Sequence, residues 1–183
     1  MPITRLTDCP ARPWKNGLGR TRELAVQPSG AGIDDFLWRV SVAEVESAAP
    51  FSAFPGIDRV IALLDGAGFT MAMDDGRRHA LTTPCAAFAF SGETGVDVAL
   101  VGGPSRDFNL MLRRGRVRGG VETWQGAGTR QPDAFIMLVY CARGSIDTEE
   151  GPLHAGDAWR PGGGALVLHG GALALAVRVE PHS

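Results

Sequence analysis

The sequence predicts an all-β protein of short antiparallel strands with few short helices, and three observations support this. Apolar and polar residues alternate with a period of two along most of the chain, as half-buried strands require. Glycine (25) and proline (12) together make up about a fifth of the 183 residues and supply many tight turns. Apolar residues reach 44% and charged residues 21%, so the chain can bury a core and is not disordered.

The first half of the chain is predicted to contain a meander of strands. Residues 36–45 place Trp38 and Val40 on one face of a strand and Arg39 and Ser41 on the other, because successive side chains alternate in direction. Small residues beside Arg39 on its face leave room for a ligand. Further strands, separated by glycine turns, are predicted within 58–76, 86–92 and 96–102.

A strand with a polar face is predicted for residues 107–112. Asp107 and Asn109 are two residues apart, so they share that face. If the face lines a cavity, both side chains point into it. In the second half of the chain the alternation resumes, and strands are predicted within 134–147, 152–161, 165–171 and 172–180.

The two halves of the chain resemble each other in pattern. An apolar run that ends in a glycine turn, 61–68 or 137–144, precedes a closing apolar strand in each half. Short, evenly spaced strands favour a closed or double-sheet architecture, since it protects strand edges, and a duplicated jelly-roll barrel is the leading candidate. We assign 1–114 to an N-terminal module carrying the polar motifs, 115–132 to a connecting stretch with little regular structure, and 133–183 to a C-terminal half that packs with the first.

Charge and hydropathy exclude several classes of partner. The chain has 18 basic and 20 acidic residues, so it lacks the basic surface that nucleic-acid binding requires. No apolar run reaches the roughly 18 residues needed to cross a bilayer, and the first residues lack the layout of a signal peptide. We therefore expect a cytoplasmic protein that interacts with neither nucleic acid nor membrane. The oligomeric state stays open, and a homo-oligomer is allowed.

The cysteines and histidines do not form a metal-binding pattern. Three cysteines is an odd number, and no Cys-x-x-Cys motif occurs, so we expect buried free thiols. The four histidines show neither His-x-His nor His-Glu-x-x-His spacing. Residues 17–22 lack the third glycine of a dinucleotide-binding loop. The sequence therefore predicts no metal and no other cofactor.

Rare polar residues concentrate in two motifs. Lys15 is the only lysine among 18 basic residues, and Asn16 and Asn109 are the only asparagines. They fall within PWKNGLGRTRE (13–23) and GGPSRDFNLMLRRGR (102–116). A lysine ammonium group is a compact point charge, whereas an arginine guanidinium group binds through paired hydrogen bonds. A single lysine near asparagine amides therefore suggests a binding site. Chance in an arginine-rich chain is the alternative.

The donors in and around these motifs predict a pocket for a small anion. Guanidinium groups bind carboxylates through paired hydrogen bonds, and a lysine adds a point charge. Aromatic side chains next to such donors form the usual wall of a small-molecule pocket. Solvated surface arginines and aromatics that plug a barrel are the alternatives. We predict Arg39, Arg59 and Lys15 as carboxylate ligands, Asn16, Ser41 and Asn109 for a polar nitrogen end, and Trp14 and Phe54 as walls.

Long blocks of the sequence resemble a known family. The two polar motifs and the block FLWRVSVAEVESAAPFSAFPGIDRVIALLDGAGF (36–69) are similar to signature blocks of the HutD/Ves family over most of the first 116 residues. The segment PLHAGDAWRPGGG (152–164) resembles the entry to a strand of a cupin barrel. One departure is Gly17-Leu18-Gly19, where family members commonly have a Gly-Gly pair.

The resemblance implies a two-module cupin, or bicupin, without a catalytic metal. Members of the family are small cytoplasmic proteins associated with bacterial histidine utilisation. The resemblance implies that the chain binds a formiminoglutamate-like carboxylate metabolite and moderates expression of the pathway. Our leading hypothesis is therefore a binding protein that is not an enzyme. The alternatives are a metal-independent enzyme acting on a histidine-degradation intermediate, with Lys15 or Asp107 as acid or base, and a stress-related interaction protein.

Overall fold

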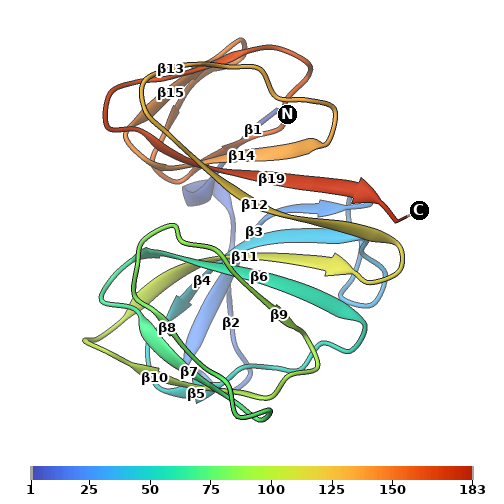
Figure 1. Cartoon of the computed structure of the whole chain (residues 1–183), viewed down its shortest axis with the longest axis vertical. Helices are drawn as coiled ribbons and strands as arrows, with labels where there is room; N and C mark the ends of the chain where they lie inside the picture. Colours follow the sequence, from blue (N-terminus) through green and yellow to red (C-terminus); the bar gives the residue numbers. More distant parts are fainter. Residues whose placement is uncertain (1, 183) are drawn as a thin grey trace. The chain divides into compact units, whose positions relative to one another are not determined.

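The computed structural model describes residues 2–182 and confirms the prediction of an all-β chain (Figure 1). One 3₁₀ helix, η1 (Leu6–Asp8), is the only helical element in this range. The residues divide into two compact units. We call Pro10–Val117 the central unit, and the residues up to Cys9 together with those from Arg118 onward the terminal unit.

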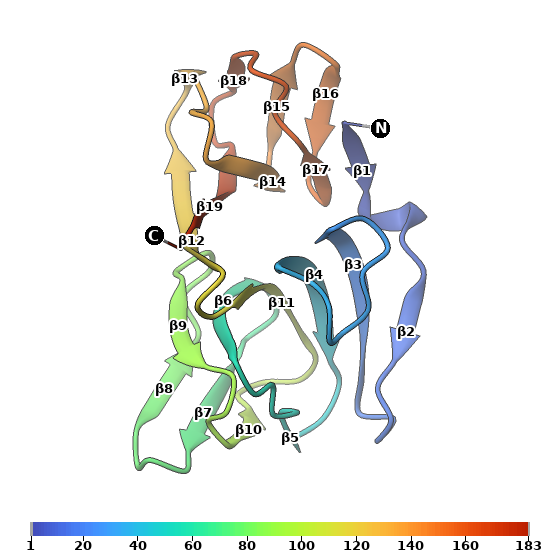
Figure 2. The ribbon, with the colours of Figure 1, turned by 90° about the vertical axis from the view of Figure 1, so that its right-hand side faces the viewer.

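Two sheets make up the central unit. One has six strands in the order β2-β3-β4-β11-β6-β9, which Figure 2 shows from right to left, and the other has four in the order β5-β10-β7-β8. Their pairings are antiparallel, as for β4 with β11 and β11 with β6. The strands are β2 (Ala11–Pro13), β3 (Gly19–Gln27), β4 (Trp38–Val45), β5 (Ala49–Pro50), β6 (Ile57–Asp65), β7 (Phe69–Met73), β8 (Arg78–Leu81), β9 (Phe88–Ser91), β10 (Val96–Leu100) and β11 (Ser105–Arg113).

The core of the central unit is apolar and includes residues of both sheets. Ile61 and Leu63 of β6 pack with Phe69 and Met71 of β7, and all four are fully buried. Burying such side chains stabilises the fold by about 1.5–3 kcal/mol each. Gly68 at the start of β7 has φ +83°, and a Cβ there would lie 2.0 Å from the carbonyl oxygen of Leu81, so no larger residue fits this close approach.

The terminal unit also contains two sheets. Their orders are β1-β17-β14-β19-β12 and β13-β18-β15-β16, and a core around the buried Trp159 includes Ile146, Leu153 and Leu166. No helix among residues 2–182 is long and apolar enough to span a membrane. The strands are β1 (Ile3–Arg5), β12 (Val117–Gln125), β13 (Gly128–Arg130), β14 (Ile136–Arg143), β15 (Ser145–Thr148), β16 (Gly151–His154), β17 (Asp157–Trp159), β18 (Leu166–Leu168) and β19 (Leu173–Pro181).

The prediction of little regular structure in residues 115–132 is wrong. This stretch contains strands β12 and β13. Strand β12 pairs with β19, and a Cβ at Gly119 would lie 1.9 Å from the carbonyl oxygen of Arg178. Backbone hydrogen bonds hold β12 in the sheet, and they need neither apolar side chains nor clear alternation. Gly119, one of the glycines that suggested a loop, lets the two strands approach each other.

Candidate functional site

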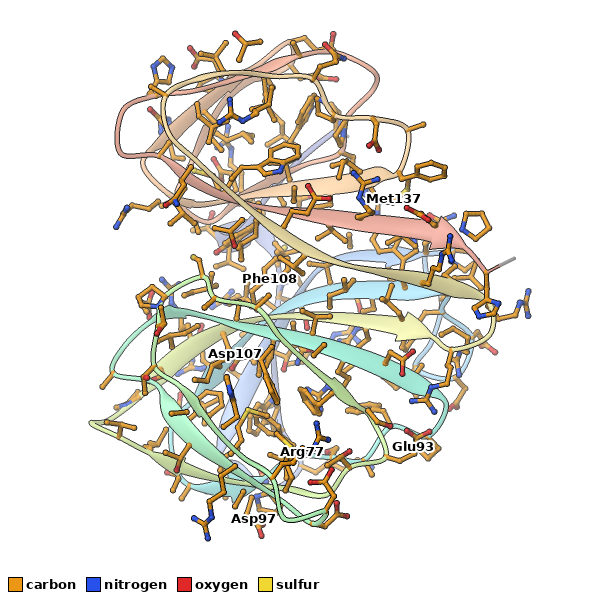
Figure 3. All side chains as sticks on the ribbon, viewed as in Figure 1. Arg77, Glu93, Asp97, Asp107, Phe108 and Met137 are labelled. Atoms are coloured by element: carbon orange, nitrogen blue, oxygen red, sulfur yellow. The ribbon has the colours of Figure 1, made fainter. Side chains whose placement is uncertain are left out.

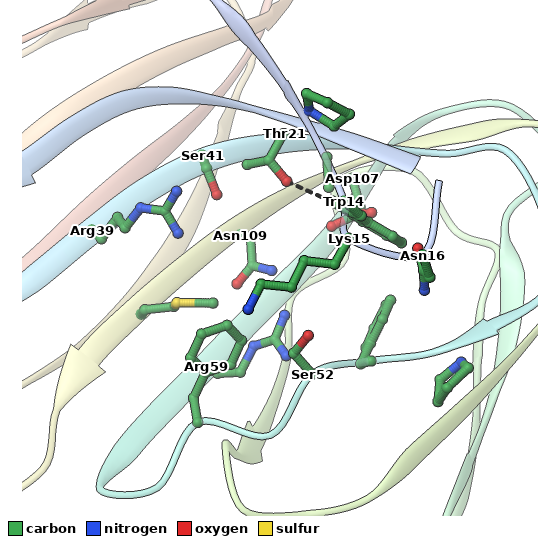
Figure 4. Close-up of a pocket in the computed structure, with 16 residues that line it drawn as sticks. Trp14, Lys15, Asn16, Thr21, Arg39, Ser41, Ser52, Arg59, Asp107 and Asn109 are labelled. Carbon is green, nitrogen blue, oxygen red and sulfur yellow. Dashed lines mark hydrogen bonds between the residues drawn. The ribbon is translucent and has the colours of Figure 1, made fainter. Parts of the chain in front are cut away.

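A cavity of about 410 Å³ lies in the central unit (Figure 4). Its size falls within the range of small-molecule sites. Strands β3, β4, β6 and β11 contribute one wall, and the segments 13–16 and 50–54 contribute the rest. The lining residues are Pro13, Trp14, Lys15, Asn16, Thr21, Arg39, Ser41, Ala43, Pro50, Phe51, Ser52, Phe54, Arg59, Asp107, Asn109 and Met111.

Strand register places the polar side chains of the sheet on one face. Arg39 of β4 lies opposite Met111 of β11, and Ser41 lies opposite Asn109. Met111 in turn lies opposite Arg59 of β6. Because residues two apart in a strand share a face, the three strands present these five side chains to the same cavity.

All eight residues that the sequence predicts for the site line this cavity. Asp107 and Asn109 also share the cavity face, whereas Phe108 between them points to the opposite face of β11 (Figure 3). Ligand binding by these residues stays a prediction. The eight are Trp14, Lys15, Asn16, Arg39, Ser41, Phe54, Arg59 and Asn109.

Sequence reasoning missed several lining residues. Thr21 belongs to the first polar motif, and its hydroxyl accepts a hydrogen bond from Trp14 Nε1 at 2.8 Å. Ser52 and Met111 also line the cavity. The sequence predicted that Asp107 shares a face with Asn109 and is an alternative acid or base, but it did not place Asp107 among the ligand-binding residues.

Arg59 is a buried cation enclosed by aromatic rings. It is 4% exposed, and its Cζ lies 5.3, 5.3 and 5.0 Å from the ring centres of Phe51, Phe54 and Phe90. Its Nε has no hydrogen-bond partner among the described residues. Burial lowers the pKa of Arg59 to about 10, so the group keeps its charge at neutral pH. The carboxylate of Asp58, which precedes Arg59 in the sequence, accepts a hydrogen bond from Arg114 Nε at 2.8 Å rather than from Arg59.

The other two cations of the cavity differ in their partners. Arg39 Nε donates to Glu23 Oε2 at 2.7 Å, so its charge is already balanced. Lys15 is exposed and has no ion-pair partner among the described residues. Figure 4 shows its side chain extending toward Asn109 and Arg59. Lys15 and Arg59 are therefore the cations available to a bound anion.

A buried acid lies on the same wall. Asp107 is 1% exposed, and neither of its carboxyl oxygens has a hydrogen-bond partner among the described residues. Burial raises the pKa of Asp107 to about 8, although the nearby Arg59 acts in the opposite direction. Burial thus favours the neutral carboxylic acid form of Asp107 over the carboxylate.

Trp14 forms a wall of the cavity above Gly19. The tryptophan ring meets Phe51 edge-to-face with 6.4 Å between ring centres. A Cβ at Gly19 would lie 2.9 Å from the Trp14 ring and 2.6 Å from the carbonyl oxygen of Glu44. The segment Gly17-Leu18-Gly19 differs from the Gly-Gly pair of the resembled family, but it keeps a glycine at position 19, where the Trp14 ring packs on strand β3.

Gly19→Ala is expected to lower the free energy of unfolding by about 1–3 kcal/mol, because ring and backbone must both shift to admit the methyl group. Urea denaturation measures the change. Gly32→Ala is the control, since a Cβ at Gly32 meets only an ordinary contact 3.8 Å away. Equal unfolding free energies for the two variants would contradict the packing described for Trp14.

No group of three or more histidine, cysteine or acidic side chains among residues 2–182 is arranged to hold a metal ion. The donors that line the cavity are guanidinium, ammonium, amide and hydroxyl groups. The guanidinium and ammonium groups among them bind oxyanions.

Comparison with known proteins gives consistent matches. The family model HutD matches residues 6–180. A Pseudomonas putida protein named "Uncharacterized 21.2 kDa protein in hutC 3'region" is 37% identical over 147 residues, covering 80% of this chain and 76% of that protein. Protein Ves of Cronobacter sakazakii is 42% identical over 110 residues, covering 60% of this chain and 59% of Ves.

Solved structures give the same result for the fold. HutD from Pseudomonas fluorescens SBW25 matches with a TM-score of 0.85 and 29% identity, covering 99% of this chain and 98% of that one. Protein Ylba from Escherichia coli matches with a TM-score of 0.70 and 9% identity, covering 99% and 91%, and this likeness shows the fold alone. The chain is thus an all-β, antiparallel, cupin-like protein.

Proposed function

The chain belongs to the HutD family, and from this premise we propose that it is a metal-free protein that binds a small carboxylate of the formiminoglutamate class. Arg59 is the observation that carries the proposal. It is a buried cation that lines a cavity of suitable size, and its Nε has no hydrogen-bond partner within residues 2–182. Desolvated charges of this kind bind a complementary anion more strongly than exposed ones.

The role of the protein is to moderate histidine utilisation. Ligand occupancy of the cavity would report the level of a pathway intermediate. The name of the Pseudomonas putida relative refers to the region 3′ of hutC, which supports a link to the hut genes. We further propose that the central and terminal units are the two cupin modules of one cytoplasmic bicupin.

A thermal-shift screen tests the proposed function. Histidine, urocanate, formiminoglutamate, formylglutamate and glutamate are each added with and without a chelator. Ligand at about 100 times its Kd adds roughly 2.7 kcal/mol of stability, which is expected to raise Tm by several degrees. We expect a chelator-insensitive shift with the formimino or formyl compound. No shift with any compound would contradict the proposal, and a shift abolished by chelator would contradict the metal-free site.

A second candidate function is a metal-independent enzyme, and Asp107 favours it. A buried carboxyl with a pKa raised to about 8 is suited to act as an acid or base near neutral pH. The test is incubation of the purified protein with formiminoglutamate, followed by chromatography. Product that forms with the natural chain but not with Asp107→Asn would favour the enzyme over the binding protein.

A further inference from the structure

Three oxygen atoms on the cavity wall accept no hydrogen bond from any group in residues 2–182. They are both carboxyl oxygens of Asp107 and the amide oxygen of Asn109. The two residues are 1% and 5% exposed, and they lie two residues apart on β11, so their side chains share one face (Figure 4). Buried acceptors without a donor are unfavourable, and native structures contain few of them.

The surrounding protein does not supply the missing donors. The charged groups that line the cavity with Asp107 are Arg59 of β6, Arg39 of β4 and Lys15 of the 13–16 segment. Arg39 donates to Glu23. Arg59 is enclosed by aromatic rings and interacts with Asp107 only through its charge. No group among the described residues donates a hydrogen bond to the three oxygens.

We propose that Asp107 and Asn109 form a recognition site for an N–H group of the ligand, while Arg59 and Lys15 bind its carboxylate. This inference rests on the proposed function, since it assigns the nitrogen-bearing end of the same ligand. The ligand class is an acidic amino acid whose nitrogen carries a small substituent. Both a formimino group and a formyl amide offer such an N–H.

Discrimination follows from the three unpartnered oxygens. A formyl amide donates one N–H to these oxygens and a formimino cation donates more than one, whereas a glutarate without nitrogen leaves all three buried and unpartnered. Sites built to hydrogen-bond a polar group reject the analogue that lacks it far more strongly than apolar pockets reject a missing methyl group. Asp107 is therefore a specificity-determining residue that selects ligands with an N–H group.

The formimino group and the formyl amide differ in the charge on the nitrogen. Burial raises the pKa of Asp107 to about 8, so the empty site holds a proton there. A cationic formimino group stabilises the ionised carboxylate, so binding releases that proton. Affinity for this ligand then rises with pH up to about 8. A neutral formyl amide adds no charge, so its affinity stays nearly constant over the same range.

Titration calorimetry tests the inference with N-formimino-L-glutamate, N-formyl-L-glutamate and the nitrogen-free 2-methylglutarate, at pH 6 and pH 8. We expect the natural chain to bind at least one nitrogen-bearing compound about tenfold or more tightly than 2-methylglutarate. Asp107→Asn should reduce this preference below about threefold, because an N–H₂ group replaces one acceptor. The affinities at pH 6 and pH 8 distinguish the two nitrogen groups, because only binding of the cationic formimino group should strengthen at the higher pH.

Asp97→Asn is the matched control, since Asp97 is exposed on β10 outside the cavity (Figure 3). It should keep the preference of the natural chain. Equal affinities for 2-methylglutarate and both nitrogen-bearing compounds in the natural chain would overturn the inference and leave the proposed function intact. Failure of all three compounds to bind would overturn the proposed function, and the inference with it.

Discussion

Arg59→Met is expected to weaken binding of a carboxylate ligand by roughly 10- to 150-fold while the chain stays folded. A hydrogen bond to a charged group contributes about 1.5–3 kcal/mol, which converts to this range of Kd. Methionine fills much of the space among Phe51, Phe54 and Phe90 and removes the unpartnered Nε. Removing a buried charge whose Nε has no hydrogen-bond partner in residues 2–182 also removes the cost of its desolvation.

Calorimetry with formiminoglutamate measures the change, and a urea melt checks the fold. Arg113→Met is the control, because Arg113 also stacks on a ring, that of Phe36 at 5.0 Å, but lies outside the cavity. Arg39→Met should have a smaller effect than Arg59→Met, since Arg39 is already paired with Glu23. If Arg59→Met and Arg113→Met bind the ligand equally well, Arg59 is not the carboxylate site.

The sequence predicted the strands and much of the cavity wall because both depend on local pattern. Alternation in 36–45 separates Trp38 from Arg39 without any knowledge of tertiary structure. The rarity of lysine and asparagine identified Lys15 and Asn109, which lie 94 positions apart in the chain and line one cavity. Residue identity and strand period were sufficient for these predictions.

What the sequence did not predict depends on distant pairings. Phe90 encloses Arg59 because β9 pairs with β6, and Glu23 balances Arg39 across β3 and β4. Neither contact follows from periodicity. The structure was therefore needed to rank Arg59 ahead of Arg39 as the cation available to a ligand, and to show that Asp107 is buried.

Asp107→Asn is expected to change the pH dependence of stability more than any surface substitution. The pKa of Asp107 is raised from its ordinary 3.8 to about 8, so between these pH values the folded chain holds a proton that the unfolded chain has released. Stability therefore falls as pH rises through this window, by on the order of 5 kcal/mol in total. The asparagine variant has no such proton and should lose this slope.

Urea unfolding from pH 4 to pH 9 gives the free energy of unfolding of the natural chain and of Asp107→Asn. The difference between these two free energies is the quantity to follow with pH. Arg59 keeps its charge across the window, and His79, whose pKa burial lowers, titrates in both chains and cancels. We expect equal stability near pH 4 and a growing advantage for Asp107→Asn up to pH 8, with Asp97→Asn parallel to the natural chain. Parallel curves for Asp107→Asn would contradict the burial of an ionisable carboxyl. A growing advantage means that the natural residue lowers stability at neutral pH, and residues with such a cost are typical of functional sites.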